Sequence, residues 1–537
     1  MVHTLRMAFD LTAWFLSPGE RRNRSSDIRA FSTGNLVSAH IHGRSYFARL
    51  HEVVSSMGQG DRLQIAAFRV DGDELLDGPG SSVSELVAAA VRRGVDVHGL
   101  VWRSQPNKLE QSEPENAAFA RDVQDAGGDV LLDPRTRRGG SHHQKLVVAQ
   151  HPAAPARDVA FLGGIDLARS RNDDADHAGD PQAMPFPDVY GKRPPWHDVQ
   201  VEIQGPAVSD LALTFRERWE GSTALDLPSP LRMVWDRSYH AGALTGTALA
   251  DPLPDPPEAG PHAVQVLRTY PARWRRYPFA PLGERSIAAA YRKVLGRAHR
   301  LIYIEDQYLW APGIARLLGR ALAGDPGLHL VAVVPRWADK DGKAAKPSLL
   351  GREQAIDVCR AAGGNRFAIY DVENHAGTPV YVHAKVVVID DVWAMVGSDN
   401  LNRRSWTHDS ELSCAVLDET LDQREPQDPA GLGDGARVFA RELRLTLWRE
   451  HLDRAADGSQ DGDLLEAGSA FAAVQAGAAA LDAWYDGGCQ GERPPGRLRS
   501  HVPERLHRRD KLWAVPVSRL VYDPDGRAVR DRVQRRP

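Results

Sequence analysis

An internal repeat, which divides the chain into two similar halves, is the feature that most constrains this fold. Strand-like runs begin at Asp61 and at His299. Each is followed by a helix-like segment (residues 84–93 and 314–323) and then by a buried apolar strand (residues 95–102 and 328–335). This order predicts βαβ units and a mostly parallel or mixed sheet in each half.

A short polar motif occupies matching positions in the two halves. His143-Gln-Lys145 and His383-Ala-Lys385 each precede an apolar run, and they lie 240 residues apart, whereas the first strands lie 238 residues apart. This agreement favours duplication over chance. We therefore expect a first half at residues 1–226, a Pro-rich linker at 227–262, a second half at 263–455, and an Ala-rich helix with a basic tail at 456–537.

The residue types in the motif suit phosphate chemistry. On a strand, residues i and i+2 point to the same face and lie roughly 7 Å apart, so each His and Lys can grip one phosphate. A lysine supplies fixed positive charge, and an imidazole with a pKa of about 6.5 can act as a nucleophile or a proton donor. In the second half the motif continues to Asp390 and then to Gly397-Ser398-x-Asn400.

These residues resemble the phospholipase D superfamily, whose motif is His-x-Lys-x4-Asp followed by Gly-Ser-x-Asn. The resemblance covers most of residues 10–455. Further segments resemble the phospholipid-cleaving branch: His142-His143-Gln144-Lys145, Gly163-Gly164-Ile165-Asp166-Leu167, Trp196-His197-Asp198, Gly205-Pro206-Ala207, Arg218-Trp219, Ile302-Tyr303-Ile304-Glu305-Asp306-Gln307-Tyr308 and Leu447-Trp448-x-Glu450-His451-Leu452.

The resemblance implies an α/β fold with a pseudo-twofold axis, in which two α-β-α sandwich halves share one active site. It also implies that His143 attacks phosphorus to form a phosphohistidine and that His383 is the acid and base. The implied site comprises His143, Lys145, His383, Lys385, Asp390, Ser398, Asn400, Glu411 and Asp198. Within it, Glu411 and Asp198 would fix the imidazole tautomers. We expect no cofactor and no metal ion.

The first motif departs from the family pattern at Gln150, where Asp is expected. The spacing from His143 to Gly163 is also six residues longer than the spacing from His383 to Gly397, and we assign the extra residues to a hairpin at 151–157. Because the motif Asp ends a strand, we expect Asp390 to anchor the backbone, and we expect Gln150 to be tolerated.

Composition excludes several classes of protein. The chain has 537 residues, a formal net charge of −4 and three cysteines, Cys359, Cys414 and Cys489. These values exclude a disulfide framework, and no run of about 18 apolar residues predicts a membrane span. The pI of about 6.6 disfavours a nucleic-acid partner. The last 47 residues carry a net charge of +7, which would attract an anionic lipid surface.

Weaker signals give further expectations. We expect the acidic loop at 173–180 to be solvated, and the apolar residues of the tail to pack on the body. Trp14, Phe15, Trp310 and Trp406 are candidates for a lipid-facing rim. About sixty residues precede the first predicted strand, which is too few for the lipid-targeting domain of the larger eukaryotic family members. Membrane engagement would then come from the catalytic body or the tail.

We therefore predict a phosphodiesterase that hydrolyses glycerophospholipids to phosphatidate and a headgroup alcohol, with transfer to other alcohols. We expect a cytoplasmic monomer with an internal pseudo-dimer, peripheral at the membrane. Three alternatives stay open: a cardiolipin-synthase-like phosphatidyltransferase, a nuclease or other non-lipid phosphodiesterase, and a non-catalytic scaffold, which Gln150 alone supports.

Overall fold

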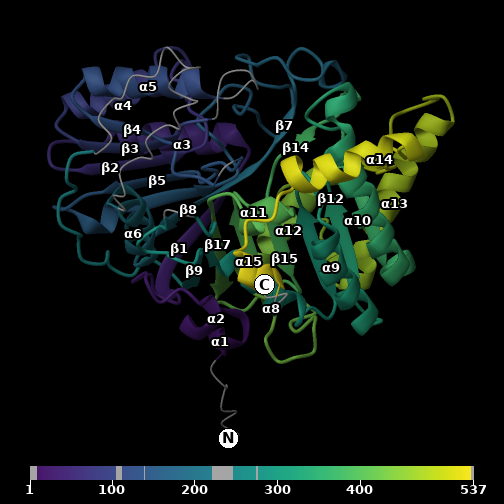
Figure 1. Ribbon diagram of the computed structural model, residues 1–537. Coiled ribbons are helices and arrows are strands. Elements are labelled where there is room, and N and C mark those ends of the chain that lie inside the picture. The colour runs from purple at the N-terminus through teal and green to yellow at the C-terminus, as the bar shows by residue number, and fades with distance from the viewer. Residues whose placement is uncertain (1–8, 105–111, 138, 221–245, 274–275, 534–537) are drawn as a thin grey trace, which may run out of the picture.

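The two halves of the chain form one continuous mixed sheet. The structure is a computed structural model that describes residues 9–104, 112–137, 139–220, 246–273 and 276–533, so residues 227–245 of the expected linker lie outside the described part. Among the described residues the sheet has sixteen strands. Figure 1 shows the first half in purple and blue beside the second half in green, with the sheet passing through both.

The first half contributes seven strands with helices on both faces. From the junction outward its strands are β1 (Ser32–Ile41), β8 (Val199–Gln204), β6 (Val159–Gly163), β5 (Leu146–Gln150), β2 (Arg62–Ala67), β3 (Asp96–Trp102) and β4 (Asp129–Asp133). Its longer helices are α3 (Gly43–Ser55), α4 (Val83–Arg92), α5 (Glu113–Asp125) and α6 (Ala207–Glu220). Two short helices, α1 (Leu11–Trp14) and α2 (Pro18–Arg21), precede β1.

The second half repeats this arrangement. Outward from the junction its strands are β9 (His262–Tyr270), β17 (Glu411–Asp418), β16 (Trp393–Gly397), β15 (Val386–Ile389), β11 (Leu301–Glu305), β12 (His329–Val333) and β13 (Phe367–Val372), with β10 (Glu284–Arg285) beside β9. Its helices are α8 (Ser286–Leu295), α9 (Pro312–Gly324), α10 (Lys346–Gly363), α11 (Arg403–Thr407), α12 (Val438–His451) and α13 (Ala467–Asp486).

The strand pairings confirm the predicted duplication and fold class. In both halves the βαβ strands pair in parallel, β2 with β3 and β11 with β12, whereas the strands nearer the junction pair antiparallel. The predicted helices at 84–93 and 314–323 are α4 and α9. In α4, Ser82 accepts a hydrogen bond from Glu85 N, and the apolar residues recur at the i, i+3, i+4 and i+7 spacing of a buried helix face.

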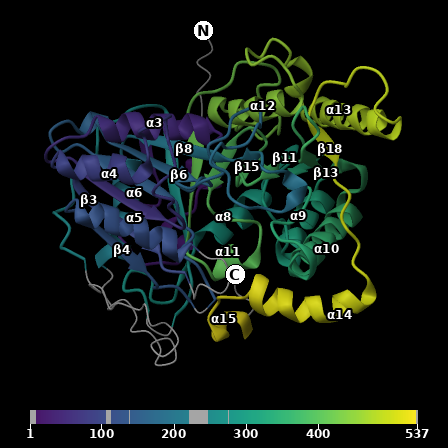
Figure 2. The same cartoon turned by 90° about the horizontal axis from the view of Figure 1, so that it is seen from above.

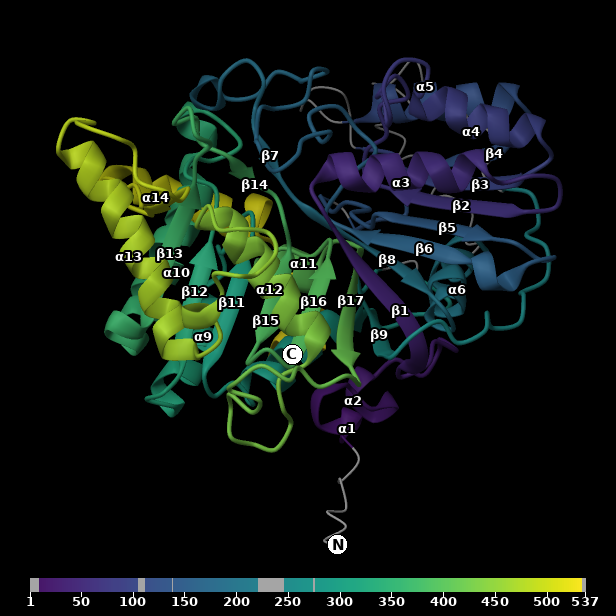
Figure 3. The ribbon, with the colours of Figure 1, turned by 180° about the vertical axis from the view of Figure 1, so that it is seen from behind.

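The junction itself was not predicted from the sequence. β1 pairs antiparallel with β9, and Figure 3 shows these two strands side by side in the middle of the sheet. Residues 32–41 alternate irregularly between buried and exposed and include Gly34 at a φ of 76°, so their strand signal is weak. The first strand therefore begins about thirty residues earlier than we expect from the sequence.

One hydrophobic core continues across the junction. It includes Val148 and Ile203 of the first half, Val266 and Val388 of the second, and Phe215 of α6. Two further cores lie under α3, α4 and α5 and under α8, α9 and α10. A shared core and a shared sheet hold the loops of the two halves in a fixed relation.

The C-terminal segment packs on the second half. β18 (Leu498–Ser500) joins the sheet beside β13, and α14 (Arg508–Val517) crosses α10 before the π-helical turn η7 (Ser518–Tyr522) and α15 (Val529–Val533). In Figure 2, α14 and α15 lie on the side opposite α12. Several tail arginines are ion-paired with the body; Arg505, for example, pairs with Asp357.

The expectation that the apolar tail residues pack on the body is only partly correct. Val515 packs against Leu350, but Leu512 is 81% exposed and Leu520 is 76% exposed. In the sequence each of these leucines directly follows a basic residue of the tail. Both side chains are exposed, one on α14 and one on η7. Within the described ranges, every helix is too short or too polar to cross a membrane.

Candidate active site at the junction of the two halves

The extended chain around His143 lies against the second half. His143 N donates to Ser410 O at 2.9 Å, and Ser410 N donates to Ser141 O at 3.0 Å. This short pairing brings His143 beside Glu411, the first residue of β17. The imidazole Nδ1 lies 2.9 Å from Glu411 Oε2, and Ser398 Oγ donates to the same oxygen at 2.5 Å.

The chain before His383 makes the corresponding contact with the first half. β14 (Tyr381–Val382) pairs in parallel with β7 (Trp196–His197), and His383 N donates to His197 O at 2.7 Å. As a result His383 Nδ1 lies 2.6 Å from Asp198 Oδ2. Each histidine is therefore oriented by the carboxylate of the other half, a crossing that the sequence did not indicate.

The two predicted lysines lie in the same site and are buried. Lys145 Nζ donates to His143 O at 3.0 Å and lies 3.5 Å from Asp166 Oδ2. Lys385 Nζ donates to His383 O and to Gln307 Oε1, the latter at 3.4 Å. Two ammonium groups beside two imidazoles form a compact cationic site that suits an anionic phosphodiester.

The turns after the two motifs differ for a steric reason. Ser398 in the second half corresponds to Gly164 in the first. A Cβ added to Gly164 would lie 2.0 Å from Asp198 Oδ1, so this position has no room for a side chain. Similarly Asp166 takes the place of Asn400, and it accepts a hydrogen bond from Arg69 N at 3.1 Å. Among the described residues, Asn400 Oδ1 is buried and has no hydrogen-bond partner.

Burial and charge set the proton affinities of the site. Burial, and then the positive charges of Lys145 and Lys385, lower the pKa of His143 well below its usual value, and the same causes act on His383. Burial also raises the pKa of Glu411 to about 8 and lowers the pKa of Lys385 to about 8. Both imidazoles are thus neutral at pH 7, which leaves a lone pair on each outer nitrogen.

Three residues at the site were not predicted as site residues from the sequence. The Phe68 ring lies 5.1 Å from the His143 ring, with Lys145 Nζ 4.9 Å from its centroid. The Trp196 ring lies 5.1 Å from the His383 ring, and the Arg171 guanidinium stacks on Trp196 at 4.0 Å. Arg171 also contributes to lowering the pKa of His383. Of these three residues, only Trp196 had a signal in the sequence, because it belongs to the segment Trp196-His197-Asp198 that resembles the family.

Comparison with known families decides the classification. A family model described as "Phospholipase D" matches residues 83–244 and 369–485, which together are more than half of the chain.

The chain belongs to the phospholipase D superfamily. A second model, described as "Cardiolipin synthase, PLD-like domain", matches residues 291–425. Phospholipase D alpha 1 of Oryza sativa subsp. japonica is 26% identical over an alignment of 526 positions, and the match covers 72% of this chain and 60% of the relative. Phospholipase D alpha 2 of Arabidopsis thaliana is 26% identical and covers 69% of this chain and 58% of its own length. The chain therefore spans about 60% of the length of these relatives.

The phosphatidylserine synthase of Haemophilus influenzae Rd KW20 is among the solved structures that match this chain. It has a TM-score of 0.49 and 15% identity, and it covers 72% of this chain and 82% of its own.

Asp390 of the superfamily motif lies outside the reacting groups. Its carboxylate accepts hydrogen bonds from His299 N, Arg300 N and Leu301 N at 2.7–2.8 Å and so anchors the start of β11. We therefore remove Asp390 from the catalytic set. In the first half, the turn before β2 is closed instead by Asp61, whose carboxylate accepts from Gly58 N at 2.9 Å.

The predicted lipid-facing rim is largely wrong. Trp14 and Phe15 are fully buried in the core of the second half. Trp310 and Trp406 are also buried, but both line a cavity of about 770 Å³ whose walls carry several arginines from α8, α9 and η7. The acidic loop is likewise not solvated as a whole, because Asp173, His177 and Asp180 are buried.

Proposed function

We propose that this member of the phospholipase D superfamily hydrolyses glycerophospholipids to phosphatidate and a headgroup alcohol. The observation that carries the proposal is the crossed pair of His–carboxylate contacts, His143 with Glu411 and His383 with Asp198. With each Nδ1 engaged, each Nε2 is left for the reaction. The two lysines supply positive charge for the non-bridging phosphate oxygens.

The first step forms a covalent intermediate. The lone pair of His143 Nε2 attacks phosphorus, and the bond from phosphorus to the headgroup oxygen breaks. That oxygen leaves with a proton from His383 Nε2, which is protonated once the anionic substrate has bound beside it. The assignment of His143 as nucleophile follows the resemblance to the family. Dividing the displacement into two steps lowers each barrier.

The second step regenerates the enzyme. A water molecule gives a proton to His383 Nε2 while its oxygen attacks phosphorus, and the bond from phosphorus to His143 Nε2 breaks. Phosphatidate leaves. An alcohol in place of water follows the same route and gives a phosphatidyl-alcohol, so hydrolysis and headgroup exchange share one intermediate.

Two observations support a lipid substrate. The curated relatives are named phospholipases D, and one matching family model is named for cardiolipin synthase. In addition, exposed leucines of α14 and η7 stand beside a cavity lined by Trp310, Trp406 and arginines. We propose that this face meets the lipid surface. A phosphatidyltransferase with a lipid acceptor is the second candidate, and it is favoured by the match to residues 291–425.

The testing experiment supplies alcohol acceptors to the purified protein. Incubation with phosphatidylcholine vesicles and 1-butanol should give phosphatidate and phosphatidylbutanol, and phosphatidylglycerol as the only acceptor should reveal any lipid–lipid transfer. His143→Ala and His383→Ala should each lose more than about 99% of the activity, because the two histidines act as one unit. Absence of every phosphatidyl product, or cleavage of single-stranded DNA in preference to lipid, would remove the lipid proposal.

A further inference from the structure

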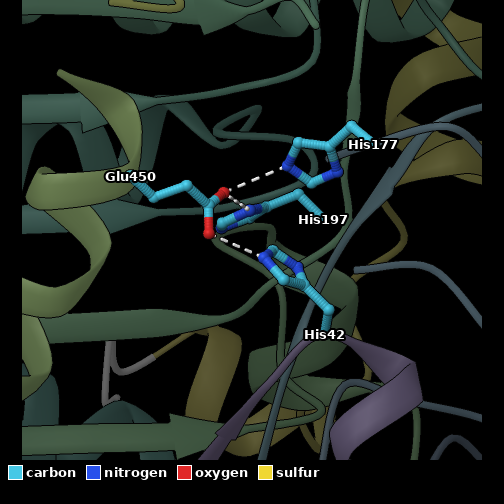
Figure 4. Close-up of side chains that lie close together, drawn as sticks. All are labelled: His42, His177, His197 and Glu450. Carbon is cyan, nitrogen blue, oxygen red and sulfur yellow. Dashed lines mark hydrogen bonds and ion pairs between the residues drawn. The ribbon is translucent and has the colours of Figure 1, made fainter. Parts of the chain in front are cut away.

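Behind the active site, three buried histidines and one glutamate converge from four separate segments. They are His42 before α3, His177 in the acidic loop, His197 in β7 and Glu450 in α12, and Figure 4 shows their side chains pointing toward one another. The three histidines are at most 3% exposed, and the Glu450 side chain is 10% exposed. Neither the proposed reaction nor the superfamily motif uses this cluster.

Among the described residues, the Nδ1 atom of each of the three imidazoles is buried without a hydrogen bond, and the Nδ1 of His197 faces Glu450. Glu450 Oε2 lies 2.7 Å from His42 Nε2, and Glu450 Oε1 lies 3.0 Å from His177 Nε2. His197 Nδ1 points at the same carboxylate at 3.4 Å, but among the described residues it is buried without a hydrogen bond. A buried, unpartnered nitrogen costs free energy unless something else satisfies it.

The arrangement fits the ligand set of a tetrahedral metal site. One nitrogen from each histidine and one carboxylate oxygen all lie within 4.8 Å of one another. Zinc bonds of 2.0–2.1 Å place tetrahedral ligand atoms about 3.3 Å apart, so a small outward shift of Glu450 would admit the ion. The rings are inclined to one another by 54–78°, which aims their edges at a common point.

A supporting shell orients these ligands. His197 Nε2 lies 2.7 Å from Glu305 Oε2, the carboxylate–histidine relay that usually accompanies a metal-bound imidazole. Glu305 Oε1 in turn lies 2.7 Å from His451 Nε2 and accepts from Tyr303 at 2.5 Å. Because both oxygens of Glu305 are thereby occupied, we place the ion among the first four residues and not between His197, Glu305 and His451.

The backbone at two of the ligands is held in an unfavourable region. His42 has a φ of 66° and His177 a φ of 53°, which side chains other than Gly seldom adopt. Such conformations persist where the surrounding structure fixes them, often at ligand sites. At both positions the strained backbone turns the imidazole into the cluster (Figure 4).

We propose that His42, His177, His197 and Glu450 bind one divalent transition-metal ion, with zinc(II) as the expected metal, and that this ion ties the two halves together. Imidazole ligands with one carboxylate favour zinc over magnesium or calcium. The first half supplies the three histidines, and the second half supplies the glutamate.

The site lies directly behind the residues that orient His383. His42 N donates to Asp198 O at 2.8 Å, and His383 N donates to His197 O at 2.7 Å. The ion would therefore fix the backbone on both sides of Asp198. The proposed role of the ion is structural. From the sequence, by contrast, we expect no metal ion.

Elemental analysis of the full-length protein, expressed with zinc and dialysed, tests the proposal. About one zinc ion per chain is expected in the wild type, and below about 0.2 per chain in His177→Asn and in Glu450→Gln. His151→Asn is the matched control, because His151 is also buried and, within the described part of the chain, its ring pairs only with Asp158, 3.4 Å away. This variant should keep its zinc. His451→Gln should also keep most of it, and selective loss in that variant would move the ion to the other cluster and overturn the assignment.

A second measurement keeps the proposal testable if the variants do not fold. Wild-type protein treated with a chelator should regain at least about 2 °C of Tm when zinc is returned. With cobalt(II) it should develop the intense visible absorption of a four-coordinate site, saturating at one equivalent. Protein that is metal-free as purified, shows no change in Tm with zinc and gives no cobalt spectrum would show that the cluster is a hydrogen-bonded network only.

Discussion

At the scale of single residues, the site depends on which carboxylate faces which histidine. Glu411 belongs to the second half but contacts His143, whereas Asp198 belongs to the first half and contacts His383. A carboxylate that accepts from Nδ1–H fixes the tautomer with a free Nε2 and stabilises the imidazolium that forms during turnover. Both carboxylates are therefore positioning residues for the histidine of the other half.

Replacing either carboxylate by its amide should slow turnover without loss of the fold. For Asp198→Asn and Glu411→Gln we expect kcat on phosphatidylcholine to fall about 10²- to 10⁴-fold, because the amide can stabilise the wrong tautomer. KM should change little. The matched control is Asp158→Asn, a buried carboxylate that accepts from His151 N outside the site. Amide variants that keep wild-type kcat would contradict the positioning role.

The activity should also fall as the pH rises through about 8. Burial lowers the pKa of Lys385 from 10.5 to about 8, so its positive charge is lost above that pH. The profile of kcat/KM reports the free enzyme and should show this alkaline limb after an acid limb, because the Glu411 carboxylate, with its pKa raised to about 8, also forms in this range. A loss of stability does not cause this fall in activity. Between pH 8 and 10.5 the unfolded chain binds more protons at Lys385 than the folded chain does. Titration of this lysine alone therefore raises the free energy of unfolding as the pH rises. A flat profile up to pH 10 would contradict the lowered pKa.

The sequence predicted the reacting groups better than their surroundings. The two His-x-Lys motifs, Ser398, Asn400 and both carboxylates were predicted because each lies in one stretch of chain that resembles the family, and the structure brings the histidines, Ser398 and the carboxylates together. The crossed contacts between each histidine and the carboxylate of the other half were not predicted. They depend on the pairing of β14 with β7 across the two halves. The His42 and Glu450 side chains are 408 residues apart in sequence, and no local pattern joins them. Phe68 and Arg171 lacked a signal for the same reason.

At the scale of elements, repeat periodicity predicted the outer βαβ units but not the junction or the tail. β2, α4 and β3 and their counterparts β11, α9 and β12 have strong apolar patterns and lie where we expect them. β1 has an irregular burial pattern, and its register against β9 shifts between Ser32 and Asn35. For the tail we predicted only a positive charge and apolar residues packed on the body, whereas β18 joins the sheet and α14 carries an exposed leucine.

The α14–η7 face gives a prediction about lipid surfaces. Burying a leucine contributes about 1.5–3 kcal/mol, or roughly tenfold or more in affinity. Leu512→Asp and Leu520→Asp should therefore each reduce vesicle binding, and activity on vesicles, at least about tenfold. Activity on a short-chain phosphatidylcholine below its micelle concentration should stay unchanged. Leu432→Asp, on an exposed residue of the loop before α12, is the control. Equal losses on vesicles and on monomers would refute a role at the membrane.

At the scale of the whole molecule, duplication has produced one active site from two similar halves. The halves share a sheet through β1 and β9, a hydrophobic core, and the two carboxylate contacts that cross between them. Each half thus supplies one histidine and the carboxylate that orients the histidine of the other half. We therefore predict a single covalent intermediate on one histidine, with the second histidine serving both steps of the reaction.

The stereochemical course at phosphorus tests this central claim most directly. The substrate is a phosphatidylcholine made chiral at phosphorus with sulphur, and the product is its phosphatidyl-alcohol. Each in-line displacement inverts phosphorus, so two displacements through a phosphohistidine predict overall retention. Inversion would mean that the acceptor attacks the lipid directly, and it would contradict a shared two-histidine site of this kind.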